Sequence, residues 1–541
     1  MPFKIFPRSG SDLSREIRAF GREEDGGMIV FSLFIVVCML LAVGASLDTA
    51  RFEYTRSKLQ HTLDRAVLAA ANLEQVLDPQ EVVEDYFAKA GLSDQLISVT
   101  VSQGVNYRTV SAVSEAQIDT MFMDMVGIET LSVPAVGEAN ETLADIEVAL
   151  VLDNSGSMRT VTDGQTRLAR LQEAAKEFVE SVARDGSDST DDGTTSISII
   201  PFAEQVTVGE TILQHYNASD EHDKTHCVTF EDADFRSTTL TQTQELNRMA
   251  YFDPYNSGWT AYDSGICDTT GNREIAPWST DAEALKLRID DMYHSGWTSI
   301  DVGTKWGVTM LDPSSQPVLT KLIASGDVDA ELAGQPFDYS RDNTMKILVV
   351  MSDGANTYQR DIASGYRSGN SPLYIYNGDY SYEYDDDGKT MYYNRYSRYD
   401  KKRETSPIGG SNARRLTWPE VWADMTVDNF ASELMSRALH SGSSSYGDYY
   451  YDKIIRGIGE TGSTSWSGNE KNPNTSDICS AAKDKGILIF SIGMDTNDST
   501  ADMTLEDCAS LPTYYYDVQS VDISNAFASI ALQINQLRLT Q

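Results

Sequence analysis

The chain has 541 residues, which is too long for one ordinary domain, and its hydrophobic fraction of 41% can fill a folded core. Its 81 acidic and 43 basic residues give a formal charge of −38 at pH 7, which excludes general attraction to nucleic acid or to an anionic membrane surface. We therefore expect two or three folded units that bind no nucleic acid.

The first predicted element is an uncharged apolar segment, Met28–Leu47, which is long enough to cross a bilayer as a helix. We expect residues 1–27 to be cytoplasmic and residues 28–47 to form the transmembrane helix. Basic residues flank the segment on both sides and orient it only weakly. Two alternatives stay open: a signal peptide cleaved near Val43–Ala45, and a prepilin-type signal after Gly26–Gly27.

Residues 48–144 are expected to form a helical stalk and a small α+β module. Apolar residues recur at helical spacing from Leu59 to Leu73, which favours an uncleaved anchor that continues as a stalk. Alternating runs at 96–101 and 108–113 are typical of half-buried strands, and the segment Ile118–Val126 is predicted to be helical.

From Asp145 the pattern changes to alternating strands and helices, which is typical of a mainly parallel sheet covered on both faces. The predicted strands are 147–152, 196–202, 346–351 and 486–492, and the predicted helices include 168–184 and 523–537. Two stretches without this pattern, at about 217–295 and 358–476, are expected to be insertions. The predicted class is α/β, with a doubly wound, mainly parallel sheet preceded by the transmembrane helix and the α+β module.

Oxygen donors follow the ends of two predicted strands and occupy one later loop. The donors are a carboxylate and two hydroxyls after the first strand, a loop hydroxyl, and a carboxylate after the strand 346–351: Asp153, Ser155, Ser157, Thr298 and Asp353. Such hard oxygen donors suit Mg²⁺, Ca²⁺ or Mn²⁺ better than zinc. Ligand sites in open α/β sheets collect at the carboxyl ends of strands. Ordinary roles also stay open, since Asp153 could cap the next helix, and Thr298 and Asp353 could be ordinary turn residues. Asp301 could also replace Thr298 as a donor.

Taken together and in this chain order, the three turns resemble the metal-ion-dependent adhesion site (MIDAS) of von Willebrand factor A (vWA) domains. The resemblance implies one ligand set: Asp153, Ser155, Ser157, Thr298 and Asp353. It also implies a divalent cation, with Mg²⁺ expected and Ca²⁺ or Mn²⁺ as alternatives. One coordination position of that cation would be left for a carboxylate of a protein partner.

The N-terminal region adds a second resemblance. Glu24–Gly27 before the apolar segment, and Leu47–Arg51 and Leu59–Ala71 after it, look like the TadE/TadG-like N-terminus of Flp/Tad pilus-assembly proteins. The C-terminal segments Cys508–Val518 and Ala526–Leu539 also look like that family. In TadG-like proteins this anchor precedes a vWA domain.

The TadG-like resemblance implies a single-pass protein of the bacterial inner membrane with a periplasmic C-terminal domain. Such a protein would bind other pilus-assembly components, and exposure at the cell surface stays open. A secreted or surface adhesin with a cleaved signal peptide is the alternative function. The sequence contains no His-Glu-x-x-His, no Gly-x-Ser-x-Gly and no phosphate-binding Gly-rich motif, so we expect no enzyme.

Four of the five cysteines lie outside the apolar segment that contains Cys38: Cys227, Cys267, Cys479 and Cys508. An even number predicts two disulfides in an oxidising compartment, which would place this part of the chain outside the cytoplasm. The spacing favours pairing each cysteine with its near neighbour, 227 with 267 and 479 with 508. Four free, buried cysteines are the alternative.

The second insertion contains a segment dense in Tyr, Asp, Asn and Gly, Tyr374–Tyr399, which we expect to be a surface loop. Tyrosine-rich loops are typical of recognition surfaces, but a loop without a partner is an equal alternative. Its acidic run Glu383–Gly388 has Asn394 where a calcium-binding EF-hand needs an acid, so we expect a solvated turn. The segment Asp185–Gly193 is also predicted to be a loop.

Overall fold

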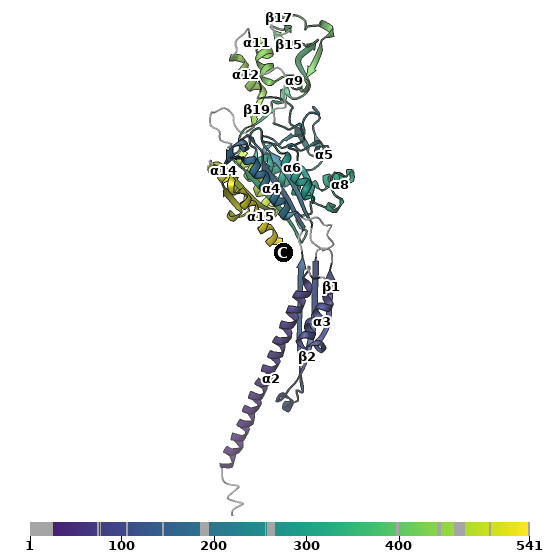
Figure 1. The fold of residues 1–541 in the computed structure, drawn as a ribbon, viewed down its shortest axis with the longest axis vertical. Coiled ribbons are helices and arrows are strands. Elements are labelled where there is room, and N and C mark those ends of the chain that lie inside the picture. The colour runs from purple at the N-terminus through teal and green to yellow at the C-terminus, as the bar shows by residue number, and fades with distance from the viewer. Residues whose placement is uncertain are drawn as a thin grey trace, which may run out of the picture. The chain divides into compact units, whose positions relative to one another are not determined.

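A computed structural model describes residues 25–72, 75, 77–103, 107–142, 145–183, 194–254, 256, 266–396, 400–440, 445–458, 471–496 and 499–538. The predicted cytoplasmic segment up to residue 24 and the predicted loop Asp185–Gly193 lie outside these residues. The chain forms two compact units, Met1–Thr142 and Leu143–Gln541 (Figure 1).

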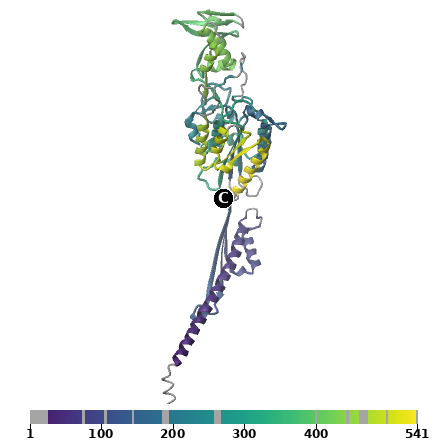
Figure 2. The ribbon, with the colours of Figure 1, turned by 90° about the vertical axis from the view of Figure 1, so that its left-hand side faces the viewer.

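The first unit combines a long helix with a three-stranded antiparallel sheet. Helix α2 runs from Asp25 to Ala71 without a break (Figure 2). It therefore continues across Val43–Ala45. It is long and apolar enough to cross a membrane, and its N-terminal half is exposed. The other elements are α3 (Pro79–Ala90), β1 (Leu96–Gln103), β2 (Tyr107–Asp119) and β3 (Thr130–Thr142), with sheet order β1-β2-β3.

The C-terminal half of α2 covers this sheet through a small core. Buried side chains that recur at helical spacing, such as Leu59, Leu63 and Ala66, pack with Phe87 of α3 and Val133 of β3. The predicted helix Ile118–Val126 is wrong, because β2 continues to Asp119 and pairs with β3 along its whole length. Only Met123–Val126 forms a short 3₁₀ turn, η2, at the tip of this hairpin.

The second unit is built on a six-stranded sheet with the order β11-β7-β4-β12-β20-β21. Its strands are β4 (Asp145–Asp153), β7 (Thr195–Phe202), β11 (Ala276–Ser279), β12 (Thr344–Ser352), β20 (Leu488–Met494) and β21 (Tyr515–Val518). All neighbours pair in parallel except β11, which lies antiparallel at one edge. This confirms the predicted mainly parallel, doubly wound α/β fold.

Helices cover both faces of the sheet. Every residue of β4 is therefore buried, and its alternate side chains pack in two different cores. Ile146, Val148 and Leu150 pack under one helix layer, and Ala149 and Val151 under the other. The first layer is α4 (Arg167–Val182), α6 (Ala282–Asp291) and α15 (Ile523–Arg538). The second is α7 (Ile300–Leu311), α8 (Gln316–Ser325), α13 (Lys471–Asp484) and α14 (Ser499–Cys508).

The stretch expected as the first insertion only partly interrupts the core, because its β11 and α6 belong to the sheet and to a helix layer. Its other described elements include β8 (Asn217–Ala218), β9 (Val228–Thr229), η4 (Asp232–Arg236) and β10 (Glu245–Arg248). The short elements β5 (Val161–Thr162), β6 (Gln165–Thr166) and α5 (Glu210–Leu213) precede them.

The second insertion folds into a sheet with the order β17-β16-β15-β14-β18 and several helices. The strands are β14 (Asn370–Tyr376), β15 (Asp379–Asp386), β16 (Lys389–Tyr396), β17 (Asp400–Glu404) and β18 (Arg414–Thr417), beside the pair β13 (Gln359–Ile362) and β19 (Ile455–Ile458). The helical elements include η7 (Ser364–Tyr366), η8 (Gly410–Asn412), α9 (Trp418–Asp424), α10 (Val427–Asn429), η9 (Phe430–Met435), α11 (Ser436–Leu439) and α12 (Ser445–Ile454).

The expectation of a loop at Tyr374–Tyr399 is therefore wrong for its described part. Tyr382, Tyr384 and Tyr393 pack in a hydrophobic cluster, so these three tyrosines lie on one face of a sheet. The acidic run does end in a solvated turn, because Asp386 pairs with Lys389 across two exposed residues with positive φ.

The two insertions share that hydrophobic cluster. Cys227, Phe252 and Cys267 of the first insertion pack in it together with Trp422 and Phe430 of the second. Segments that are far apart in the sequence therefore build one accessory core.

Candidate metal site

The carboxyl ends of β4 and β12 lie next to each other, because the strands pair in parallel with Leu152 opposite Met351. Each strand leads directly into a predicted donor turn, so Asp153 and Asp353 leave the sheet at the same edge. Both side chains are buried.

Four of the five predicted donors, Asp153, Ser155, Ser157 and Asp353, form one connected hydrogen-bond chain. Asp153 Oδ1 accepts a bond of 2.7 Å from the backbone N–H of Ser155. The Ser155 and Ser157 hydroxyl oxygens lie 2.9 Å apart, and Ser157 donates to Asp353 Oδ1 at 2.6 Å. The other oxygen of Asp153 accepts from the Ser352 hydroxyl at 2.7 Å.

The loop that carries Thr298 is fastened to the first turn by its backbone. Gly156 N–H donates to the Gly296 carbonyl at 2.9 Å, and a Cβ at position 156 would lie only 3.0 Å from that oxygen. The backbone N–H of Thr298 donates to Thr357 Oγ1 at 2.7 Å, and its carbonyl accepts from the Thr357 N–H at 2.9 Å. Thr298 is thus held beside the first turn by its backbone and is buried.

Asp301, the predicted alternative to Thr298, is paired with a lysine. Its Oδ1 lies 3.2 Å from Nζ of Lys471, and both side chains are buried. Lys471 also donates to the Ser299 hydroxyl, which in turn donates to the Glu204 carbonyl at 2.8 Å. The pair Asp301–Lys471 therefore stabilises the Thr298 loop through Ser299, the residue after Thr298.

Both site carboxylates have raised pKa values. Burial and the neighbouring charge of Asp353 raise the pKa of Asp153, although hydrogen bonds from Ser352 and Ser155 lower it. Burial also raises the pKa of Asp353, although hydrogen bonds from Ser157 and Arg167 lower it. The turns therefore hold more negative charge than their surroundings compensate.

Two charged residues of the site, Arg167 and Asp495, were not predicted from the sequence. Arg167, the first residue of α4, donates through Nη1 to Asp353 Oδ2 at 2.8 Å and through Nε to Asp495 Oδ2 at 3.1 Å. Asp495 follows β20 directly, so the rule that found Asp153 and Asp353, a buried strand ending in Asp, could have found it. Arg167 offers no comparable signal.

Two family models match the chain. The model for Flp pilus-assembly TadE/G-like proteins matches residues 26–73, and the model for the von Willebrand factor type A domain matches residues 148–219. The chain joins a TadE/G-like segment to a vWA domain. This confirms the predicted TadE/G-like anchor and the predicted vWA domain, whereas the metal-ion-dependent adhesion site stays a prediction.

Solved structures with low identity are also similar to the chain. The vWF domain of the type V pili tip protein Mfa5 from Porphyromonas gingivalis is 12% identical, covers 73% of this chain and 96% of its own, and has a TM-score of 0.32. The pilus adhesin SpaC from Lactobacillus rhamnosus GG is 12% identical over 81% of this chain and 34% of its own, with a TM-score of 0.30. Proximal thread matrix protein 1 from the mussel byssus, with a zinc-occupied MIDAS motif, is 9% identical over 72% of this chain and 46% of its own, with a TM-score of 0.25. The comparison with curated proteins gave no match.

The donor set of the vWA domain fits a divalent cation. Asp153 and Asp353 are both buried, the Arg167 guanidinium pairs with Asp353, and the hydroxyls of Ser155 and Ser157 add neutral oxygen donors. Hard cations such as Mg²⁺ and Ca²⁺ prefer such oxygen ligands. Among the residues that the structure describes, no three or more His, Cys, Asp or Glu side chains converge as a metal site, so the turn hydroxyls would have to complete the shell.

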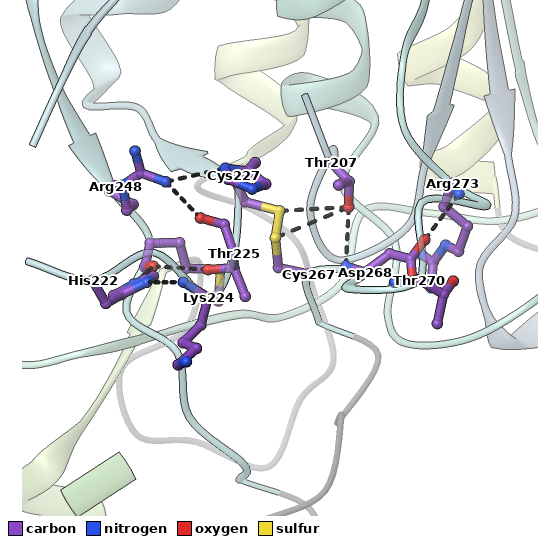
Figure 3. Close-up of a disulfide and its surroundings, with 12 residues drawn as sticks. Thr207, His222, Lys224, Thr225, Cys227, Arg248, Cys267, Asp268, Thr270 and Arg273 are labelled. Carbon is purple, nitrogen blue, oxygen red and sulfur yellow. Dashed lines mark hydrogen bonds between the residues drawn. A yellow bond between two sulfur atoms is a disulfide. The ribbon is translucent and has the colours of Figure 1, made fainter. Parts of the chain in front are cut away.

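The vWA unit contains two disulfides, Cys227–Cys267 and Cys479–Cys508, with Cα–Cα distances of 6.0 and 5.1 Å. Figure 3 shows the first one beside Thr207, whose hydroxyl accepts from the Asp268 N–H at 3.0 Å. Asp268 in turn accepts from the backbone N–H of Arg273 at 2.9 Å.

The same segment also contacts the turn that follows β4. The Arg273 guanidinium contacts the side chain of Asn154, which lies between the predicted donors Asp153 and Ser155 in the sequence. The Cys227–Cys267 disulfide thus fastens a segment that also supports the candidate site.

Proposed function

We propose that the chain is a membrane-anchored component of Flp/Tad pilus assembly whose vWA domain binds a protein partner through a divalent cation. The cation would be held by the predicted set: Asp153, Ser155, Ser157, Thr298 and Asp353. The observation that carries the proposal is the connected chain of buried carboxylates and hydroxyls at the carboxyl edge of β4 and β12. The TadE/G-like segment at residues 26–73 supports the link to pili.

The chemistry of recognition follows from the charges. A divalent cation would neutralise the buried Asp153 and Asp353, of which only Asp353 is paired with a base, Arg167, among the described contacts. An oxygen donor of a partner, such as a carboxylate, would complete the coordination shell. Because that donor must reach one fixed place, binding would be selective for an exposed acidic side chain.

The proposed location is the bacterial inner membrane, with the vWA domain in the periplasm. Two disulfides favour an oxidising compartment for the second unit. The unbroken α2 supports an uncleaved anchor, because its C-terminal half is part of the first unit's core. The alternative, a surface adhesin with a cleaved signal peptide, predicts a mature chain that lacks the residues up to about Ala45. The intact mass of the native protein distinguishes an uncleaved anchor from a cleaved signal peptide.

The functional test is capture of purified Tad assembly proteins by the full-length chain in lipid nanodiscs, with Mg²⁺ or with EDTA. Asp153→Asn removes one charge while keeping an oxygen that can accept from the Ser155 N–H. Asp163→Asn is the matched control, because Asp163 lies exposed in a nearby turn at φ 49°, a conformation that Asn tolerates.

We expect wild type and Asp163→Asn to retain a partner only with Mg²⁺, and Asp153→Asn to retain none. Capture that is equal with Mg²⁺ and EDTA, or equal for wild type and Asp153→Asn, would contradict the proposed role of the metal.

A further inference from the structure

The tip of the β2–β3 hairpin, residues 120–129, exposes several apolar side chains. Met121, Met125 and Val126 are 62%, 71% and 62% exposed, and Ile128 is 44% exposed. Apolar side chains gathered on one exposed turn indicate a contact surface rather than part of a core.

This hairpin tip is fastened to α2 through one carboxylate. Asp48 is buried and accepts backbone N–H bonds from Met121, Phe122 and Met123 at 3.0, 2.8 and 2.9 Å. Although burial raises the pKa of Asp48, these three bonds lower it below its ordinary value. Asp48 is also the first charged residue after the uncharged segment Met28–Leu47, so the tip is held where that segment ends.

A second contact carries the tip further along the apolar segment. A Cβ at Gly44 would lie 2.3 Å from Cγ of Phe122, so the ring rests directly on the helix backbone at a position that only glycine allows. Gly44 precedes Asp48 by four residues, which is about 6 Å along the helix axis. The tip therefore lies alongside the last turn of the membrane-crossing segment.

We propose that the hairpin tip enters the interface of the same bilayer that α2 crosses, on the side where α2 emerges. This inference rests on the proposed anchor, since α2 brings the tip to membrane depth. Transfer of apolar side chains from water to the boundary between headgroups and acyl chains is favourable. The buried Asp48 is tolerable there because three N–H groups satisfy it.

The exposed acids of the same segment, Asp124 and Glu129, would remain in the headgroup layer. The geometry favours the bilayer over a protein partner as the occupant of this patch. Phe122 contacts α2 at both Gly44 and Asp48, so the exposed side chains of the hairpin tip lie directly beside the apolar segment of α2. The hairpin would then set the depth and rotation of α2 as a second membrane contact.

The test uses the full-length chain in phosphatidylcholine vesicles whose acyl chains carry bromine, a short-range quencher. An environment-sensitive fluorophore is attached to Met125→Cys, with Cys38→Ser in the background, because Cys38 is the free, exposed cysteine of the described chain. Met503→Cys is the matched control, since Met503 is a 60% exposed methionine on α14 in the other unit. A third sample carries the fluorophore on Cys38 itself, inside α2.

We expect strong quenching at positions 38 and 125 and none at position 503. Quenching at 38 but not at 125 would overturn the inference while leaving the anchor intact. A probe at 125 that is shifted to the blue but not quenched would mean that protein, not lipid, covers the tip, and would also overturn it. No quenching at 38 would remove the anchor itself, and the inference with it.

Discussion

The paired strands β4 and β12 carry buried charges at both ends, and the two ends are compensated differently. Near their amino ends, Glu147 lies directly opposite Lys346 and accepts a hydrogen bond from it. Asp145 next to it pairs with Arg341 at 2.8 Å. Each acid here has a basic partner supplied by the chain itself.

At the carboxyl ends of the same strands the acids outnumber the bases. Arg167 pairs with Asp353 and Asp495, and no basic side chain is bonded to Asp153 among the contacts of the described residues. The comparison teaches that burial does not by itself mark a site. A buried acid with its own lysine has a structural role, whereas buried acids with incomplete compensation are where we propose that the chain uses a divalent cation.

The largest expected effect is at the compensated end. Lys346→Met should lower the free energy of unfolding by about 3–5 kcal/mol, because it leaves Glu147 buried and unpaired. Urea denaturation of the full chain measures this. The double variant Glu147→Gln/Lys346→Met should recover much of the loss, since Gln can still accept from the Phe337 N–H. A double variant that is less stable than Lys346→Met would show that the two ends do not differ in this way.

A smaller effect is expected at the metal end. Arg167→Gln should lower the free energy of unfolding of the metal-free chain by about 1–3 kcal/mol, because Asp353 and Asp495 lose a charged donor. With saturating Mg²⁺ the loss should shrink, since the cation would neutralise Asp353. Denaturation with and without Mg²⁺ gives both values, and an identical loss under both conditions would argue against a cation next to Asp353.

The smallest effect concerns a buried lysine with no carboxylate bonded to it among the described contacts. Lys305 donates to the Ser237 carbonyl at 2.6 Å, and burial lowers its pKa to about 8, although Asp234 and Asp312 raise it. From about pH 8 to about pH 10.5 the unfolded chain binds more protons than the folded chain, so folding gains stability as pH rises.

Relative to Lys305→Met, wild type should therefore gain about 1–2 kcal/mol between about pH 7.5 and about pH 9.5. Denaturation of both proteins at the two pH values provides the comparison. A difference in stability between the two proteins that does not change with pH would mean that burial does not lower the pKa of Lys305.

The sequence predicts the core strands well because each is a continuous apolar run closed by a polar turn. The predicted strand 346–351 falls inside β12, and 147–152 falls inside β4. Four of the five predicted donors lie in mutual hydrogen-bond contact for the same reason, because donors that follow parallel neighbouring strands must meet at one edge. Whether they bind a metal stays a prediction.

Other features depended on contacts that the sequence does not display. Arg167 lies 186 residues from Asp353 and 328 residues from Asp495 in the chain, so no local pattern joins them. The tyrosine-rich segment resembles a loop by composition, and only its period of two, as in Tyr382 and Tyr384, indicated a strand. Ile118–Val126 has apolar residues at helical spacing, but cross-strand pairing with β3 extends β2 to Asp119.

The central claim is that the uncompensated end of β4 and β12 binds a divalent cation, and calorimetric titration of the full-length chain in nanodiscs with Mg²⁺, Ca²⁺ and Mn²⁺ tests it most directly. We predict saturable binding of at least one of these ions by wild type and by Asp163→Asn, and no binding by a folded Asp153→Asn. Absence of binding to wild type, or equal binding by Asp153→Asn, would contradict the account.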